Sequence, residues 1–116
     1  MKNEFEERTF RFALRVVKFI GGLPQNTSGT VIGRQLMKSG TAIGAIYHEA
    51  QRAESKADFV HKVTMSEKEA AETEYWLMLC VEAKLSPEEA TKLLDESRQL
   101  LAIITTIGRK AKLTRT

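Results

Sequence analysis

Residues 86–107, SPEEATKLLDESRQLLAIITTI, carry the clearest secondary-structure signal in the chain. Ser86 can cap a helix with its hydroxyl, Pro87 suits the first helical position because no N–H is needed there, and Glu89 can reach back to the cap. Leucine and isoleucine then recur at spacings that place them on one face of a helix. The stretch therefore predicts an amphipathic helix with one buried side. The expected buried residues are Leu93, Leu94, Leu100, Leu101, Ile104 and Ile107.

Three segments nearer the N-terminus show the same helical periodicity. Residues 4–21 end at a glycine pair, and residues 30–53 repeat apolar side chains every three, four or seven positions. Residues 56–84 follow Ser55, which forms a capping-box pattern with Asp58. No stretch alternates apolar and polar residues as a half-buried strand does. The sequence thus predicts four helices and no sheet.

These four helices nearly fill the 116 residues of the chain, and its composition of 42% hydrophobic and 28% charged residues is that of a globular protein. A chain of this length forms one domain. We therefore expect an all-α protein, a single domain of residues 1–116, folded as an antiparallel up-down four-helix bundle. Gly108 is expected to end the last helix, with a short basic tail from about residue 108.

Several functional classes find no support in the sequence. Charges recur throughout the first twenty residues, which therefore predict neither a signal peptide nor a membrane span, and we expect a cytoplasmic protein without a membrane partner. The single cysteine, Cys80, lies in the apolar run WLMLCV and is expected to be an inert core thiol. His48 and His61 are expected on helix exteriors. No phosphate-binding loop, nucleophile elbow or metal-ligand motif is present, so we expect no enzyme, no cofactor and no metal.

The formal net charge of +3 conceals an uneven distribution of charge along the chain. The first two segments and the tail are basic, whereas residues 54–107 are net acidic. Cations at helical spacing form a stripe on each of the first two helices, which can bind nucleic-acid phosphates through counterion release. The alternative is a solvated face paired with acidic residues of a neighbouring helix or subunit. The candidate phosphate-binding residues are Arg8, Arg11, Arg15, Lys18, Arg34, Lys38 and Arg52, with Arg109, Lys110, Lys112 and Arg115 in the tail.

Two carboxylates fall on the apolar seam expected for residues 56–84. Glu67 and Glu74 share this seam with apolar residues, and a bare charge in an apolar interior costs several kcal/mol. We expect each to form a salt bridge or a hydrogen bond with a basic or hydroxyl side chain and so to fix helix register or subunit orientation. A metal site or an acid–base pair is the alternative. The expected seam residues are Val60, Val63, Ala70, Leu77, Met78 and Val81.

Three glycines interrupt the middle of the second predicted helix. Gly33, Gly40 and Gly44 each cost roughly 1 kcal/mol relative to alanine, so a compensating contact is expected. At 100° per residue they gather on a strip beside the core face. We expect another helix to approach closely there, from the same chain or from a neighbouring one; local bending is the alternative.

Two long strings carry a family resemblance. RQLMKSGTAIGAIYHEAQRAESKADFVHKV (residues 34–63) and EAAETEYWLMLCVEAKL (residues 69–85) resemble the bacterial four-helix-bundle family that includes proteins encoded by intervening sequences of 23S rRNA genes, also called the 23S ribosomal protein family. The resemblance spans about residues 5–112. The sequence is also similar to the accessory variability protein of diversity-generating retroelements, a basic pentamer thought to bind nucleic acid.

The resemblance implies an up-down bundle, a homopentamer in several relatives, and no enzymatic activity. Combined with the basic stripes, it favours a non-enzymatic, self-associating bundle whose basic surface binds RNA or DNA with little sequence preference. The alternative is an oligomeric protein–protein interaction scaffold with no nucleic-acid role.

Overall fold

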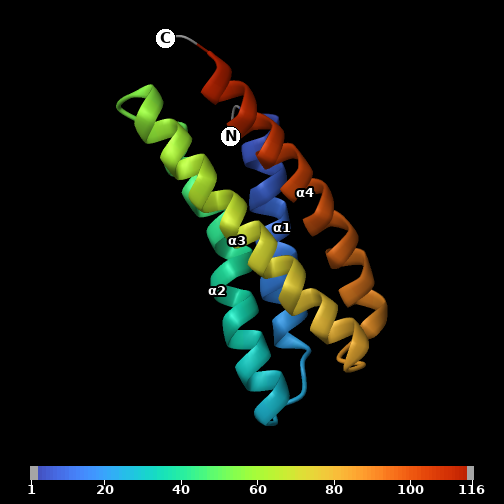
Figure 1. Ribbon diagram of the computed structural model, residues 1–116. Coiled ribbons are helices and arrows are strands. Elements are labelled where there is room, and N and C mark those ends of the chain that lie inside the picture. The colour runs from blue at the N-terminus through green and yellow to red at the C-terminus, as the bar shows by residue number, and fades with distance from the viewer. Residues whose placement is uncertain (1–2, 115–116) are drawn as a thin grey trace.

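Four helices run antiparallel to their sequence neighbours in the computed structural model, which describes residues 3–114 (Figure 1). They are α1 (Glu4–Gly21), α2 (Thr27–Ala50), α3 (Lys56–Glu82) and α4 (Pro87–Leu113). α1 packs on α2, α2 on α3 and α3 on α4, whereas the contact between α1 and α4 that closes the bundle is the least extensive. The molecule is a rod with extents of 49 × 22 × 21 Å. The prediction of an all-α up-down bundle is confirmed.

Side-chain caps fix the start of the first three helices. Asn3 accepts hydrogen bonds from the N–H groups of Phe5 and Glu6, and Ser55 accepts one from the N–H of Asp58, as its capping-box pattern predicts. Asn26 accepts a hydrogen bond from the N–H of Gly29 and starts α2 at Thr27. The predicted range 30–53 begins three residues late, because the asparagine cap precedes the apolar periodicity, and it also ends three residues late, since the helix ends at Ala50.

The turn between α3 and α4 differs from the sequence prediction. Lys84 adopts a left-handed conformation (φ 60°), and the N–H groups of Lys84 and Leu85 bond to the carbonyls of Val81 and Cys80 in a Schellman arrangement. Ser86 is also left-handed (φ 47°, ψ 57°), and its hydroxyl makes no capping bond. The predicted Ser86 cap is wrong. An N-cap residue needs an extended backbone for its side chain to reach the helix N–H groups, whereas the short α3–α4 turn holds Ser86 in the left-handed conformation.

The end of α4 also lies beyond its predicted position. Gly108 is buried inside the helix, where an added Cβ would lie 3.2 Å from Cγ1 of Val63, and the helix continues to Leu113. The glycine therefore serves the crossing of α3 and α4, and the prediction of a tail from residue 108 is wrong. Lys110 and Lys112 fall in the last turn, where cations stabilise the negative end of the helix dipole.

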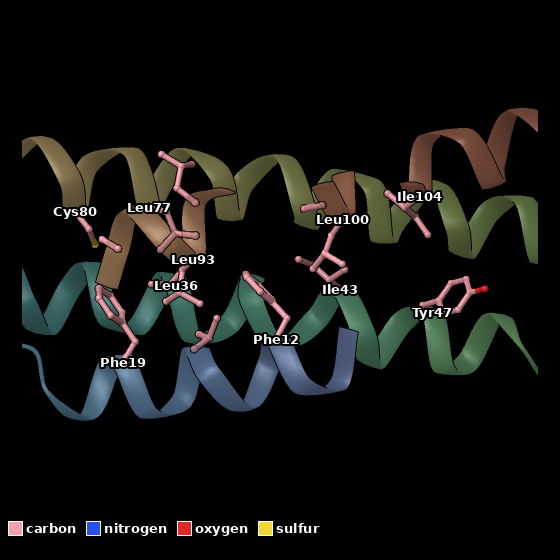
Figure 2. Close-up of a cluster of buried hydrophobic side chains, with 14 of the residues drawn as sticks. Phe12, Phe19, Leu36, Ile43, Tyr47, Leu77, Cys80, Leu93, Leu100 and Ile104 are labelled. Carbon is pink, nitrogen blue, oxygen red and sulfur yellow. The ribbon is translucent and has the colours of Figure 1, made fainter. Parts of the chain in front are cut away.

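The core runs along the whole bundle and takes apolar side chains from all four helices (Figure 2). Cys80 is fully buried, as expected, and burial raises the pKa of its thiol. Met78 was predicted on the same seam but is 44% exposed, because Thr73, Leu77 and Cys80 occupy the core-facing positions of this part of α3. The labelled core residues are Phe12, Phe19, Leu36, Ile43, Tyr47, Leu77, Cys80, Leu93, Leu100 and Ile104.

Candidate nucleic-acid interface and the adjoining groove

The basic stripe of α1 is partly used inside the molecule. Arg8 donates from Nε and Nη2 to the two carboxylate oxygens of Glu96 on α4, both at 2.8 Å, and Nη2 also donates to Gln99. Arg15 lies 3.9 Å from the carboxylate of Glu89, which is also on α4. The guanidinium of Arg8 holds the pKa of Glu96 below its ordinary value. These two arginines therefore tie α1 to α4, which is the paired arrangement that the sequence left open.

The other two cations of α1 lie on its outer side. Arg11 Nη1 is 3.1 Å from Oε1 of Glu7, one helical turn away, and both side chains are at least half exposed. Lys18 is exposed and makes no ion pair within residues 3–114. The predicted stripe of four is thus divided between an inner pair and an outer pair.

The cationic stripe of α2 is exposed to solvent. Arg34, Lys38 and Arg52 are exposed, and none of them is within ion-pair distance of a carboxylate in the described part of the chain. Burial and the Glu72 carboxylate raise the pKa of Glu69, and the charge of Lys38 offsets part of that rise. Arg34 and Lys38 also border a hollow at the turn between α1 and α2.

The basic residues at the end of α4 lie apart from those two. Arg109, Lys110 and Lys112 are exposed on the last turns of the helix, next to the connection between α2 and α3. Arg34 lies in the half of α2 that follows the α1–α2 turn, toward the opposite end of the rod, and Lys38 lies at the middle of that helix. Arg115 lies outside the described residues. The structure therefore presents two cationic areas on one molecule, separated along its length.

The strip of glycines on α2 lies against α1 of the same chain. A Cβ added at Gly33 would lie 3.3 Å from Ile20, and one at Gly40 would lie 3.0 Å from Val16. At Gly44 it would lie 3.0 Å from Oγ1 and 3.2 Å from the backbone carbon of Thr9. The close approach expected from the sequence is therefore intramolecular, and it sets Lys18 at the level of Arg34 and Lys38.

The two seam carboxylates lie between α3 and α4. Thr105 donates its hydroxyl to Glu67 at 2.7 Å, and Arg98 donates Nε to Glu74 at 2.7 Å. A hydroxyl and a basic group are the partner types that the sequence predicted. Within residues 3–114, no cluster of three or more His, Cys, Asp or Glu side chains is suited to hold a metal ion.

An apolar groove on the outer face of α1 and α2 was missed by the sequence analysis. It has a volume of about 530 Å³; Phe10, Ala13, Thr41 and Ala45 line it, and Glu6, His48 and Glu49 lie at one end. On α1, Phe10, Leu14 and Val17 are 54%, 46% and 42% exposed. The signal in the sequence is a second apolar stripe on α1, nearly opposite the core stripe of Phe12, Val16 and Phe19 at 100° per residue.

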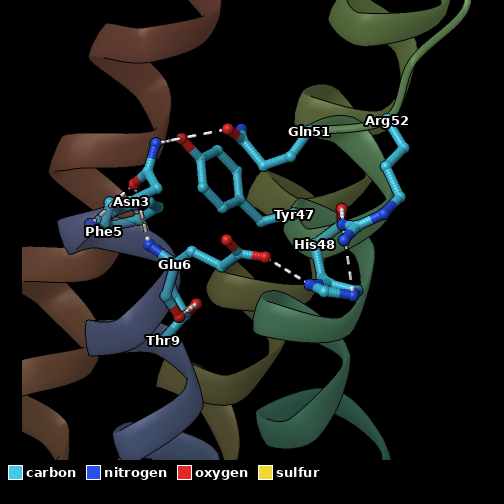
Figure 3. Close-up of polar contacts among 8 residues, drawn as sticks. All are labelled: Asn3, Phe5, Glu6, Thr9, Tyr47, His48, Gln51 and Arg52. Atoms are coloured by element: carbon cyan, nitrogen blue, oxygen red, sulfur yellow. Dashed lines mark hydrogen bonds and ion pairs between the residues drawn. The ribbon is translucent and has the colours of Figure 1, made fainter. Parts of the chain in front are cut away.

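A polar network closes the end of this groove (Figure 3). The carboxylate of Glu6 is nearly buried and contacts Nδ1 of His48, while Nη1 of Arg52 faces the other ring nitrogen at 3.4 Å. Nη1 of Arg52 also donates to the backbone carbonyl oxygen of His48 at 3.4 Å, so Arg52 and Glu6 contact the two sides of the imidazole ring. His48 is half exposed as expected, but its pairing with Glu6 was not foreseen. His61 is exposed.

These features define the class: an all-α, antiparallel four-helix bundle with a divided cationic surface and an apolar outer groove. The family model for the 23S rRNA-intervening sequence protein matches residues 1–106, and the chain belongs to that family. A solved structure from Bacteroides thetaiotaomicron, described as a protein of unknown function from the S23 ribosomal protein family, is similar with a TM-score of 0.79. It shares 33% sequence identity, and the match covers 89% of this chain and 96% of that one.

No match was found among curated proteins. Nothing in the comparisons assigns a catalytic activity, since the solved relative is described only as a protein of unknown function. Between residues 3 and 114, no helix combines the length and apolar character needed to cross a bilayer.

Proposed function

We propose that this protein is a non-enzymatic, self-associating bundle whose cationic surface binds the phosphate backbone of RNA or DNA with little sequence preference. The observation that carries the proposal is the outer face of α2, where Arg34 and Lys38 are exposed and lie outside ion-pair distance of any described carboxylate. Cations held on a rigid helix can release counterions from a nucleic acid without first giving up an internal partner.

The structure narrows the set of residues proposed to contact phosphates. Arg8 is removed from it, because Glu96 and Gln99 hold its guanidinium at 2.8 Å. Arg11 and Arg15 stay, because exposed pairs such as Arg11–Glu7 and Arg15–Glu89 are worth at most about 1 kcal/mol each and exchange readily. No aromatic residue interleaves with these cations, so base stacking adds little sequence preference. The proposed set is Arg11, Arg15, Lys18, Arg34, Lys38, Arg52, Arg109, Lys110 and Lys112, with Arg115 beyond the described residues.

Fluorescence anisotropy tests the proposal with labelled structured RNA, duplex DNA and single strands at low salt. We expect binding that weakens steeply with salt, and a double variant Arg34→Gln, Lys38→Gln whose log–log salt slope falls by about 2, because two phosphate contacts are lost. The matched control is Lys68→Gln, Lys92→Gln, which removes the same charge from α3 and α4. Absence of any complex at low salt contradicts the proposal, as does equal weakening by the control pair.

A purely oligomeric scaffold is the second candidate, and the exposed apolar strip of Phe10, Leu14 and Val17 favours it. It predicts assembly without any nucleic-acid binding, so light scattering together with the anisotropy titration separates the two functions. The family resemblance implies a pentamer, which predicts a particle of five times the 13.1 kDa chain mass. Subunit number therefore remains a prediction for the same light-scattering measurement.

A further inference from the structure

We propose that the hollow at the α1–α2 turn binds a nucleotide, with the base against its apolar lining and the phosphate on Arg34 and Lys38. The inference rests on the proposed function, because it uses two of the same cations, and it goes further by giving the base a place in the structure. A free mononucleotide and an unpaired nucleotide of a strand share this chemistry, and the experiments below distinguish them.

The size and lining of the hollow suit a small planar ligand. Its volume is about 530 Å³, and it lies between the end of α1, the turn and the first half of α2. Small-molecule sites in proteins have volumes of about 300–1,000 Å³ and are lined mainly by apolar groups with a few polar ones. Here Ile20, Leu23, Pro24 and Met37 supply the apolar part of the lining. The hollow therefore has the dimensions and the apolar surface of a ligand site.

Glycines in the lining keep the hollow open. Gly29 and Gly33 both lie in it. A Cβ at Gly29 would meet the carbonyl oxygen of Pro24, and one at Gly33 would lie 3.3 Å from Ile20. The packing of α2 against α1 and the turn thus excludes side chains at two positions of this lining, and the space beside them stays free.

Charge favours an anionic ligand in this hollow and not in the apolar groove of the same two helices. Arg34 and Lys38 are spaced four residues apart on one face of α2, and both are exposed and outside ion-pair distance of any described carboxylate. The lining, which lies wholly within residues 3–114, contains no Asp or Glu. In the groove, by contrast, Glu6 and Glu49 would repel a phosphate. The hollow therefore combines apolar surface with unpaired positive charge.

This combination matches a nucleotide better than a bare phosphate. A base has flat apolar faces that gain free energy when they leave water for a surface such as that of Leu23, Pro24 and Met37. Gln25 and Thr30 add polar side chains that can bond to the base edge or the sugar. Aliphatic side chains contact every base in a similar way, so the site adds little sequence preference. Bases in a duplex are stacked and paired, so only an unpaired nucleotide can enter.

NMR spectra of the full chain, ¹³C-labelled at the methionine methyl groups, test where the base lies. Met37 lines the hollow, whereas Met65 and Met78 are exposed on α3 and serve as internal references. The common nucleoside 5′-monophosphates should each shift the Met37 methyl resonance, because the ring current of a base acts on a methyl group in contact with it. The Met65 and Met78 resonances should not move. Inorganic phosphate at the same concentration should not reproduce the shift, and Met37→Leu assigns the resonance.

Thr30→Glu and Thr27→Glu form a matched pair of variants. Each adds one carboxylate near the start of α2, where negative charge suits the helix dipole. Only position 30 lines the hollow, and it lies one helical turn before Arg34, so the new carboxylate pairs with that guanidinium. We expect Thr30→Glu to abolish the Met37 shift and to raise the Kd for a single-stranded oligonucleotide about 10-fold, through loss of a charge-assisted contact. Thr27→Glu should retain both. Circular dichroism checks folding, and the double variant Arg34→Gln, Lys38→Gln replaces Thr30→Glu if that protein does not fold.

The Met37 shift decides the inference, and the anisotropy titration decides the proposed function. A shift caused by single strands but not by a blunt duplex supports an unpaired nucleotide in the hollow. A shift caused by mononucleotides, with no RNA or DNA complex in the titration, keeps the nucleotide site and removes nucleic-acid binding. RNA or DNA that binds while neither strands nor mononucleotides shift Met37 overturns the inference and leaves the proposed function standing. An equal shift with inorganic phosphate, or equal losses in Thr30→Glu and Thr27→Glu, also overturns the inference.

Discussion

Gly29 occupies a position in α2 where one methyl group decides whether the α1–α2 turn can form. A Cβ there would lie 2.0 Å from the carbonyl oxygen of Pro24 and 3.0 Å from its carbon. Since the obstacle is backbone, the Gly29→Ala variant must shift the turn, and we expect a loss of about 1–3 kcal/mol in the free energy of unfolding. Urea denaturation measures it. Gly21→Ala is the control, because nothing lies within 4 Å of a Cβ at that position. Equal stability of the two variants would contradict the assigned clash.

The ion pair between Arg8 and Glu96 predicts a pH dependence of stability. Because Arg8 holds the pKa of Glu96 below its ordinary value, the pair stabilises the folded state above the unfolded pKa, and this contribution is lost as pH falls through the folded value. We expect Glu96→Gln to lower the free energy of unfolding by roughly 1 kcal/mol at pH 7, with the difference from wild type shrinking below about pH 4.

Thermal unfolding of both proteins from pH 3 to pH 7 gives this difference. Glu7→Gln is the control, because the pair of Glu7 with Arg11 is exposed on a single helix and contributes little. A wild-type advantage over Glu96→Gln that does not change with pH would show that the carboxylate acts by packing rather than by charge.

At the scale of single residues, the sequence predicted which kind of side chain a polar residue contacts, but not which particular residue it contacts. Spacing along α3 indicated that Glu67 and Glu74 need a hydroxyl or a cation, and Thr105 and Arg98 supply them. The same reasoning could not show that Arg8 faces Glu96, because spacing defines a face of one helix but not which helix lies against it. That pairing depends on how two helices distant in sequence are aligned in the bundle.

The turn that joins α3 to α4 stores strain at Lys84. A residue other than glycine at φ 60° costs roughly 1–2 kcal/mol, and the Schellman bonds at this position normally favour glycine. We expect Lys84→Gly to raise the free energy of unfolding by about 1 kcal/mol, which differential scanning calorimetry would detect as a higher melting temperature. Lys84→Gln is the control for the lost charge and should leave stability nearly unchanged. A lower melting temperature for Lys84→Gly would refute the assigned strain.

Helix ends were predictable where the signal is local. The glycine pair after residue 20 and the Ser55 cap mark the end of α1 and the start of α3 as the structure has them. Glycine often ends a helix, but Gly108 lies inside α4. It is needed there because Val63 on the facing helix leaves little room for a side chain. The helix end was therefore mispredicted because glycine at this position serves a contact between two helices, and a single sequence does not show which helices are in contact.

For the whole molecule, the decisive feature is that α1 carries two apolar stripes while a bundle buries one. The stripe with Phe12 and Val16 enters the core, and the stripe with Phe10 and Leu14 stays exposed beside the groove. The cations were visible in the sequence, but their division into internal ties to α4 and an outer surface required the packed structure. The two proposed activities, self-association and nucleic-acid binding, are therefore assigned to chemically different surfaces of the molecule.

That difference predicts opposite responses of the two proposed activities to salt. Phosphate binding by three or four of the proposed cations in one chain should weaken roughly 20- to 150-fold between 50 and 200 mM salt, because the release of counterions from the nucleic acid is less favourable at higher salt. An assembly held by the exposed apolar strip of Phe10, Leu14 and Val17 should persist over the same range, since salt does not screen the burial of apolar surface. Light scattering and anisotropy on the same samples would follow both. If the particle dissociated in parallel with the nucleic acid, charge rather than the apolar strip would hold the copies together.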